Sequence, residues 1–197
     1  MDIEWKLNEN VFEQIDKIFG PHDIDLFASQ DNHQIKRYVS YLPDPNAEFI
    51  DAFSVNWNKL NAYVFPPFSI IGRVLQKMKL EEADITLVAP IWTTQTWFPE
   101  ILHSIVQDSY VIPKKKFLLY QTSDSQQKYP LQKMTLAVFR LSGKSSKAQA
   151  YQKTLQRSFY HHGEDLRKNN IGHISENGCH FVVKNKLIYL KQLNWKY

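Results

Sequence analysis

Three short segments place aromatic and polar residues directly after small or proline residues. They read DLFAS at 25–29, VFPPF at 64–68 and VAPIW at 88–92. Each ends an apolar run that predicts a β-strand, and open α/β sheets bind ligands at the carboxyl ends of their strands. Side by side, the three ends would form a cleft with aromatic walls. The alternative is that the prolines only terminate strands and the aromatic residues belong to the core.

The proline pair Pro66–Pro67 determines where one of these strands stops. Proline has no N–H to donate to a sheet ladder, so the apolar run 61–65 must end here as a strand. Phe65 and Phe68 stand on either side of the pair. The sequence therefore predicts a rigid strand end walled by aromatic rings.

Hydrophobic periodicity predicts the elements that position these strand ends. Apolar residues at helical spacing predict helices over 8–19, 69–83 and 94–109. Asn8 and Ser69 are the expected N-caps, and Gly20 is the expected stop of the first helix. Apolar runs predict strands over 23–29, 61–65, 84–90, 110–112, 117–120 and 136–141. We expect a helical turn within 30–41 and a loop over 41–49.

Strands that alternate with helices over residues 1–120 predict a layered α/β domain with a mainly parallel sheet. The composition changes after residue 141, where a polar linker, SGKSSKAQ, leads to a basic helix over 148–160. A polar stretch follows, and residues 179–193 predict two strands around a Lys-Asn-Lys turn. We therefore divide the chain into an α/β domain, 1–141, and a basic C-terminal extension, 142–197.

The charge of the 197-residue chain is distributed unevenly. Residues 1–110 hold 16 acidic and 8 basic side chains, a net charge of −8, whereas residues 111–197 hold 4 acidic and 16 basic ones, a net charge of +12. A basic half suggests contact with a polyanion such as DNA or RNA. The alternative is a fragment of a longer protein, cut at an arbitrary point.

Six basic residues are the candidate nucleic-acid contacts. They are Lys114, Lys115 and Lys116 ahead of a predicted strand, and Lys147, Lys153 and Arg157 along the predicted basic helix. A lysine that meets a phosphate releases a counterion, so such binding is salt-dependent and blind to sequence. The alternative is a positively charged surface that only faces water.

Other site classes find little support in the residue types. Cys179 is the single cysteine, which rules out an internal disulfide and a cysteine-based zinc site, and the histidines lack metal-ligand spacing. The carboxylates Asp23, Asp25 and Asp51 lack the fourth partner of a two-metal nuclease site. We therefore expect no metal. The absence of an 18-residue apolar run predicts no membrane span, and the acidic N-terminus is unlike a secretory signal, so we expect a cytoplasmic or nuclear protein.

The order of the motifs resembles that of the phage-type, Dam-like DNA adenine-N6 methyltransferases over about residues 5–110. Those proteins show a helix ending in Phe-Gly, a strand of the type Asp-x-x-Ala, an Asn, an Asp and a Trp, then Asn-Pro-Pro-Tyr, and an apolar strand ending in Pro before Trp-Phe. The matching residues are Phe19, Gly20, Asp25, Ala28, Asn32, Asp51, Trp57, Pro66, Pro67, Phe68, Pro90, Trp97 and Phe98. The resemblance implies a Rossmann-like methyltransferase sheet.

The resemblance also implies roles for individual residues. In such enzymes the Asn or Asp side chain and the first Pro carbonyl accept hydrogen bonds from the adenine amine, and the final aromatic stacks on the extruded base. The loop Phe65–Phe68 would be this catalytic loop, but Phe65 occupies the acceptor position and phenylalanine has no acceptor. Asp25, Ala28 and Asp51 would contact S-adenosylmethionine.

A second resemblance concerns the context of the chain. The run from DLFAS to WFP is similar to the segment between the reverse transcriptase–RNase H part and the tyrosine recombinase part of polyproteins from DIRS-like retroelements. We therefore expect a degenerate methyltransferase-like domain of such a polyprotein, weak or inactive in methyl transfer. The alternative is a module without chemistry that binds nucleic acid or spaces the RNase H and recombinase parts.

Overall fold

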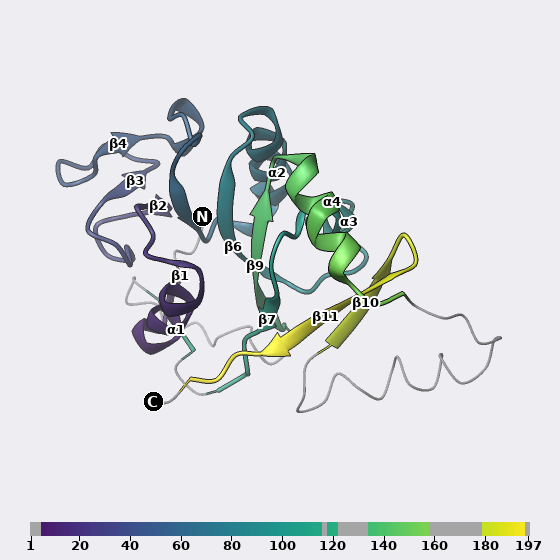
Figure 1. Cartoon of the computed structure of the whole chain (residues 1–197). Helices are drawn as coiled ribbons and strands as arrows, with labels where there is room; N and C mark the ends of the chain where they lie inside the picture. The colour runs from purple at the N-terminus through teal and green to yellow at the C-terminus, as the bar shows by residue number, and fades with distance from the viewer. Residues whose placement is uncertain (1–4, 116–117, 122–133, 158–178, 196–197) are drawn as a thin grey trace.

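The computed structural model describes residues 5–115, 118–121, 134–157 and 179–195 (Figure 1). Four α-helices lie in these ranges: α1 (Glu9–Phe19), α2 (Ile71–Leu80), α3 (Phe98–Ser104) and α4 (Ser145–Thr154). Two 3-10 helices accompany them, η1 (Ala52–Ser54) and η2 (Phe68–Ile70). The strands are β1 (Trp5–Leu7), β2 (Ile24–Ala28), β3 (Tyr38–Ser40), β4 (Phe49–Ile50), β5 (Asn61–Val64), β6 (Asp84–Pro90), β7 (Ser109–Val111), β8 (Leu119–Gln121), β9 (Leu136–Ser142), β10 (Cys179–Val183) and β11 (Lys186–Gln192).

Nine of the strands form one sheet, in the order β10-β11-β7-β9-β6-β5-β2-β3-β4. The pairs from β6 to β4 and the β7–β11 pair are parallel, whereas β9 runs antiparallel to both of its neighbours and β10 runs antiparallel to β11. The predicted α/β class with a mainly parallel sheet and flanking helices is confirmed. The strands β1 and β8 form a separate antiparallel pair.

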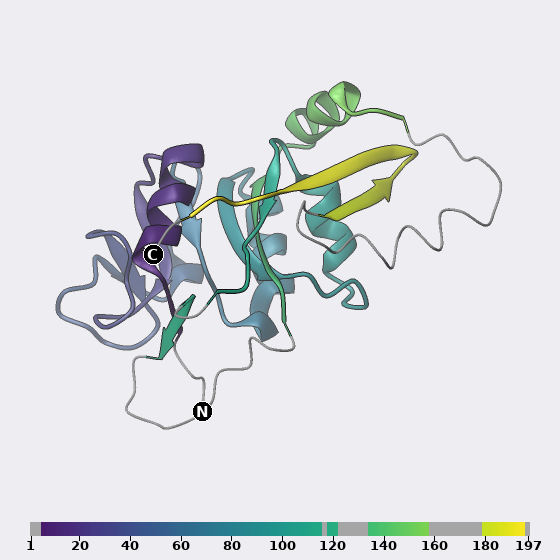
Figure 2. The ribbon, with the colours of Figure 1, turned by 90° about the horizontal axis from the view of Figure 1, so that it is seen from below.

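Alternation along the central strands divides the core between the two faces of the sheet. On β5, Ala62 and Val64 pack with α2 and α3, whereas Tyr63 packs with α1 on the other face. On β6 and β9, Leu87 and Phe139 belong to the first cluster. Figure 2 shows α1 on the opposite side of the sheet from α2 and α3. The sheet is therefore covered on both faces, as parallel sheets require.

A partly buried polar network connects the end of α1 to the sheet. The imidazole of His22 lies 2.6 Å from Asp16 Oδ1 through Nδ1 and 2.8 Å from Thr86 Oγ1 through Nε2. Arg140 Nη1 donates to Thr86 Oγ1 at 3.0 Å and to Asn61 Oδ1 at 2.6 Å. Burial lowers the pKa of His22, although the neighbouring Asp16 acts in the opposite direction. The network links four elements through hydrogen bonds that the apolar core could not provide.

The helix boundaries confirm one predicted cap and correct the other. The Asn8 side chain accepts from Asn10 N at 2.9 Å and caps α1, and Gly20 follows its last residue, as predicted. Ser69 is not an N-cap: it lies inside η2, and α2 begins at Ile71 without a side-chain cap. The chain enters the 3-10 helix η2 directly after the proline pair, and α2 continues from η2. The start of α2 therefore has no side-chain cap.

The later helices are shorter than predicted. The helix expected over 94–109 is limited to α3, with Pro99 in its first turn, because Ile105 leaves the helix and bridges to Leu141 of β9. The basic helix expected over 148–160 is α4, which begins at Ser145 and ends at Thr154, so Arg157 follows the helix instead of lying on it. In both cases contacts with a strand end the helical run.

The segment expected to hold only turns contains two short strands. β3 pairs with β2, and β4 pairs with β3 at the edge of the sheet. Strands of three and two residues are too short to show an alternating pattern. β3 forms by pairing with β2, and β4 forms by pairing with β3, and a local sequence pattern contains neither pairing.

The residues beyond 141 contribute to the same sheet. β10 and β11 form the predicted hairpin, with Lys184 and Asn185 at positive φ in its turn, and β11 lies parallel to β7. The proposed boundary at residue 141 falls inside β9 and stays a prediction. The polar stretch 161–178 lies outside the described residues.

The strand order places a switch point beside β2. From β2 the chain adds β3 and β4 on one side, and then crosses to add β5 and β6 on the other side. Neighbouring loops at such a point leave the sheet in opposite directions, which opens a crevice at the carboxyl ends of the strands. In this chain the crevice lies between the ends of β2 and β5.

Candidate functional site

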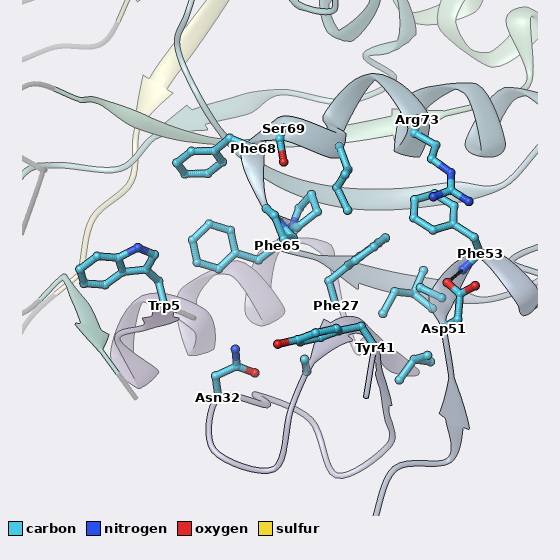
Figure 3. Close-up of a pocket in the computed structure, with 17 residues that line it drawn as sticks. Trp5, Phe27, Asn32, Tyr41, Asp51, Phe53, Phe65, Phe68, Ser69 and Arg73 are labelled. Carbon is cyan, nitrogen blue, oxygen red and sulfur yellow. Dashed lines mark hydrogen bonds between the residues drawn. The ribbon is translucent and has the colours of Figure 1, made fainter. Parts of the chain in front are cut away.

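A cavity of about 490 Å³ lies at this switch point (Figure 3). Its volume is in the range typical of small-molecule sites. The wall includes the whole predicted catalytic loop, Phe65–Phe68, together with Ala28 and Asp51. The structure therefore brings six of the seven predicted catalytic and cofactor-binding residues to one cavity.

The loop after β5 forms the aromatic wall of the cavity. β5 ends at Val64, and the rings of Phe65 and Phe68 lie with centroids 6.3 Å apart. Phe68 in turn contacts Trp92, which follows β6, in an edge-to-face arrangement at 5.4 Å. The ends of β5 and β6 thus meet through Phe68 and Trp92, as their sequences predict. Phe65 contributes a ring and no hydrogen-bonding atom.

Asp51 reaches the cavity from the loop after β4. Its carboxylate accepts from Phe53 N at 2.9 Å, and Figure 3 shows it beside Phe53 at one end of the cavity. The residue has φ 61° and ψ 104°, a conformation that L-residues with a side chain rarely adopt. Such strain costs on the order of 1–3 kcal/mol and concentrates at functional sites. The loop therefore holds a carboxylate at the cavity at an energetic cost.

Asp25 lies apart from the cavity wall. Its side chain is 2% exposed, and it accepts a backbone hydrogen bond from Gln34 N at 3.1 Å and a longer one from Phe27 N at 3.4 Å. Burial raises the pKa of Asp25 to about 7. Asp25 is not among the residues that line the cavity, and its direct contact with a cofactor stays a prediction. The carboxylate instead connects β2 to the loop that follows it.

Several cavity residues were not predicted from the sequence. Trp5 lies on β1, which pairs with β8; Tyr41 directly follows β3, and Arg73 lies on α2. The Arg73 guanidinium lies over the Phe53 ring, 3.9 Å from its centroid. No local signal identifies these residues, because long-range pairing brings their elements to the cavity. Asn32 also lines the cavity. It matches an Asn of the family motif, but the resemblance assigns no role to that residue.

The predicted basic contacts separate into two groups. Lys114 is exposed after β7, but Lys115 Nζ donates to Trp195 O at 2.6 Å and lies over the Trp195 ring. Lys116 lies outside the described residues. The segment after β7 therefore presents Lys114 to solvent, whereas Lys115 is held against the C-terminal part of the chain.

The second group surrounds α4. Lys147 is paired with Asp84 at 2.5 Å and its side chain is still 47% exposed. Lys153 is exposed on the helix, and Arg157 is exposed beyond its end. All three residues therefore face solvent, and Lys147 is in addition paired with a carboxylate. Figure 1 shows α4 and the cavity strands β2 and β3 at different parts of the molecule.

In the part of the chain that the structure describes, no cluster of three or more His, Cys, Asp or Glu side chains is arranged to hold a metal ion. None of the helices in those same ranges is long and apolar enough to cross a membrane.

The cavity as a whole can take a flat ligand between aromatic side chains, with a carboxylate and a guanidinium at one end and an amide at the other. No curated protein shows significant sequence similarity to the chain. The family model described as DNA N-6-adenine-methyltransferase (Dam) matches residues 2–149. This match covers most of the 197 residues, including the cavity and the strands that form it. The chain therefore belongs to the Dam family of DNA N6-adenine methyltransferases.

Proposed function

We propose that this domain binds nucleic acid and stacks a base in the cavity, and that it has lost most of the capacity to methylate adenine. The proposal rests on the identity and position of one residue, Phe65. Its side chain lines the cavity at the position where the family motif has Asn or Asp. Phenylalanine has no hydrogen-bond acceptor.

The loss follows from the chemistry of the adenine amine. An exocyclic amine is a poor nucleophile, and two acceptors are needed to direct its lone pair toward the methyl donor. Of the two acceptors in the family motif, the Pro66 carbonyl is kept and the side chain at position 65 no longer provides one. A preorganised hydrogen bond to a reacting group typically contributes roughly 10²–10³-fold in rate. We expect a loss of this order.

The cavity fits S-adenosylmethionine, the methyl donor that the family implies. Ala28 leaves room at the end of β2, and the Asp51 carboxylate can accept hydrogen bonds from hydroxyl or amino groups. The aromatic rings of Phe27 and Phe53 add flat walls. When bound, the cofactor supplies an electrophilic methyl group. Asp25 is buried and is not among the residues that line this cavity.

Contacts with the nucleic-acid backbone come from a different part of the surface. Lys153 and Arg157 near α4, with Lys114 after β7, are exposed cations that can meet phosphates. These contacts are independent of sequence, so base selection is left to the cavity.

A binding or spacer module without chemistry is the second candidate, and Phe65 favours it. Calorimetric titration with S-adenosylmethionine separates the two candidates, using the wild-type protein and Phe65→Asn in parallel. Binding by both forms supports a methyltransferase site without its side-chain acceptor. If neither form binds, the cavity does not serve methyl transfer, and the binding module is the better account.

We also propose that the chain belongs to a retroelement polyprotein, with RNase H and recombinase parts as its partners and the nucleus or cytoplasm as its location. The support is the sequence resemblance of residues 25–99 to the corresponding segment of such elements. Sequencing the surrounding locus tests this proposal. A reading frame with reverse transcriptase upstream and a tyrosine recombinase downstream is expected, and a gene without either would contradict it.

A further inference from the structure

A row of aromatic rings continues from the cavity to the end of β6. The Phe65 and Phe68 rings line the cavity with centroids 6.3 Å apart, and the Trp92 ring follows at 5.4 Å from Phe68. Figure 3 shows Phe68 at the end of the cavity away from Asp51 and Arg73. Trp92 itself is not among the residues that line the cavity. The row of rings therefore extends beyond the cavity wall.

Trp92 is partly exposed, and its backbone is held in place. Its N donates to Pro90 O and its O accepts from Gln95 N, each at 3.0 Å. In the ranges that the structure describes, the indole Nε1 has no hydrogen-bond partner and is not among the buried polar atoms without one. The indole nitrogen therefore reaches solvent, where it can only donate. Trp92 thus presents part of a fixed ring and an N–H donor at the surface.

The charges beside the cavity favour a nucleic-acid strand on the β6 side. Residues 91–97 carry no charged side chain, and the four polar residues 93–96 are exposed. On the other side of the cavity, along β3 and β4, residues 41–51 carry three acidic side chains and no basic one. Carboxylates repel phosphates, whereas hydroxyl and amide side chains often contact them. A strand that enters the cavity therefore leaves it more favourably over β6 than over β4.

We propose that Trp92 is a second stacking site, on which the nucleotide next to the base in the cavity stacks, so that the strand runs from the cavity over the end of β6. The inference rests on the proposed function, because it assumes that a base enters the cavity and stacks on Phe68. The planes of the Phe68 and Trp92 rings are inclined by 79°. The two bases are therefore splayed apart, as neighbouring bases are when one of them is extruded.

The second site adds affinity without adding a sequence preference. Stacking on an aromatic side chain does not require a particular base, because every base has a flat face. Since the two nucleotides are covalently linked, the second base stacks in an intramolecular step once the first is bound. The gain in affinity therefore depends on whether a base follows directly beside the one in the cavity.

Two matched oligonucleotides test this dependence. Both are short single strands whose sugars are abasic except at two positions, which carry thymine. The two thymines are adjacent in one strand, and several abasic sugars separate them in the other. The strands have the same composition and charge, and either thymine can enter the cavity in both. The ratio of their dissociation constants, measured by fluorescence anisotropy, therefore reports the contribution of a neighbouring base, whichever direction the strand takes.

We expect the wild type to bind the adjacent pair more tightly by roughly 5-fold or more, the lower end of the range for one stacked base. Trp92→Leu should bring the ratio close to one, and Trp92→Phe should keep it, because phenylalanine also stacks. Phe49→Leu, on the acidic side of the cavity, should leave the ratio unchanged. A ratio close to one in the wild type overturns the inference, and so does a ratio that Trp92→Leu leaves unchanged.

Tryptophan fluorescence keeps the inference testable if Trp92→Leu does not fold, since Trp92 also packs against the core. A base that stacks on an indole quenches its fluorescence, so the adjacent pair should quench the wild type more strongly than the separated pair does. Trp92→Phe should abolish this difference between the two strands. A difference that persists in Trp92→Phe would overturn the inference.

A fully abasic strand separates this inference from the proposed function. If the wild type binds it as tightly as the strands that carry thymine, no base enters the cavity, and the proposed function and the inference fail together. If the strands that carry thymine bind more tightly and Phe68→Ala removes the gain, the proposed function stands. The ratio between adjacent and separated thymines then decides the inference alone.

Discussion

The rings of Phe65 and Phe68 line the same cavity with centroids 6.3 Å apart and planes inclined by 49°. They are the first and last residues of a loop whose two prolines end β5. On the proposed function, Phe68 is the aromatic residue that stacks on a base, and Phe65 stands where the family motif has the Asn or Asp that accepts from the adenine amine. The loop thus keeps a stacking surface and lacks an acceptor.

Phe68→Ala should weaken binding of single-stranded oligonucleotides. Stacking of a base on an aromatic ring contributes about 1–3 kcal/mol, so we expect roughly a 5- to 150-fold loss of affinity. Fluorescence anisotropy with a labelled strand measures the effect. Phe49→Ala is the matched control, because Phe49 is 45% exposed on β4 and does not line the cavity. Equal losses in both variants would contradict a stacking role for Phe68.

Asp25→Asn should change how stability depends on pH. The folded pKa of Asp25 is about 7, raised by burial from an ordinary value of 3.8. Between these values the folded state binds the extra proton, so the stability of the wild type falls as pH rises from 4 to 7. The variant avoids ionisation and can still accept from Gln34 N.

Urea unfolding at several pH values measures this difference. The free energy of unfolding of Asp25→Asn, relative to that of the wild type, should rise from pH 4 to 7 and level off above pH 7. The scale is a few kcal/mol, since one pKa unit corresponds to about 1.4 kcal/mol. A difference that does not change with pH would show that Asp25 titrates normally in the folded protein.

Lys153→Ala with Arg157→Ala should reduce the salt dependence of nucleic-acid binding. Removing one cation that meets a phosphate lowers the slope of log affinity against log salt concentration by roughly 0.7 for a single strand. A salt series with the same labelled oligonucleotide measures the slope. Lys17→Ala serves as the control, since Lys17 is exposed on α1. An unchanged slope in the double variant would place the phosphate-binding residues elsewhere.

Gly143→Ala should destabilise the fold, and Gly72→Ala should not. A Cβ at Gly143 would lie 2.0 Å from Met78 O, at the close approach between the end of β9 and α2. Because the contacted atom belongs to the backbone, it cannot move away as a flexible side chain could. We therefore expect the free energy of unfolding to fall by about 1–3 kcal/mol. A Cβ at Gly72 meets nothing within 4 Å, and alanine is favoured over glycine in a helix by about 0.5–1 kcal/mol. Thermal unfolding compares the two, and equal melting temperatures would contradict the close approach.

Local sequence was sufficient to predict the elements with strong patterns. The amphipathic run that forms α1, the doubly buried strand β6 and the proline-terminated β5 were all predicted from spacing and composition. The α/β class follows from their alternation, and the ends of β2 and β5 meet because parallel neighbours share an edge.

The remaining features depend on contacts between distant segments. β3 and β4 form by pairing, Trp5 reaches the cavity because β1 pairs with β8, and Arg73 reaches it over Phe53. Asp25 has the sequence position of a strand-end carboxylate, but the loop that carries Gln34 folds over it. Burial of this kind results from the packing of a distant loop, which cannot be predicted from the spacing of residues along the chain.

The most direct test of the account is methyl transfer to adenine in DNA by the wild type and Phe65→Asn, measured with labelled S-adenosylmethionine. We expect both proteins to bind the cofactor, the wild type to transfer little or no methyl group, and Phe65→Asn to be faster by roughly 10²-fold or more. Phe65→Leu controls for the change of shape, because leucine also lacks an acceptor. Efficient methylation of adenine by the wild type would contradict the account, since it would show that a side-chain acceptor at position 65 is not needed.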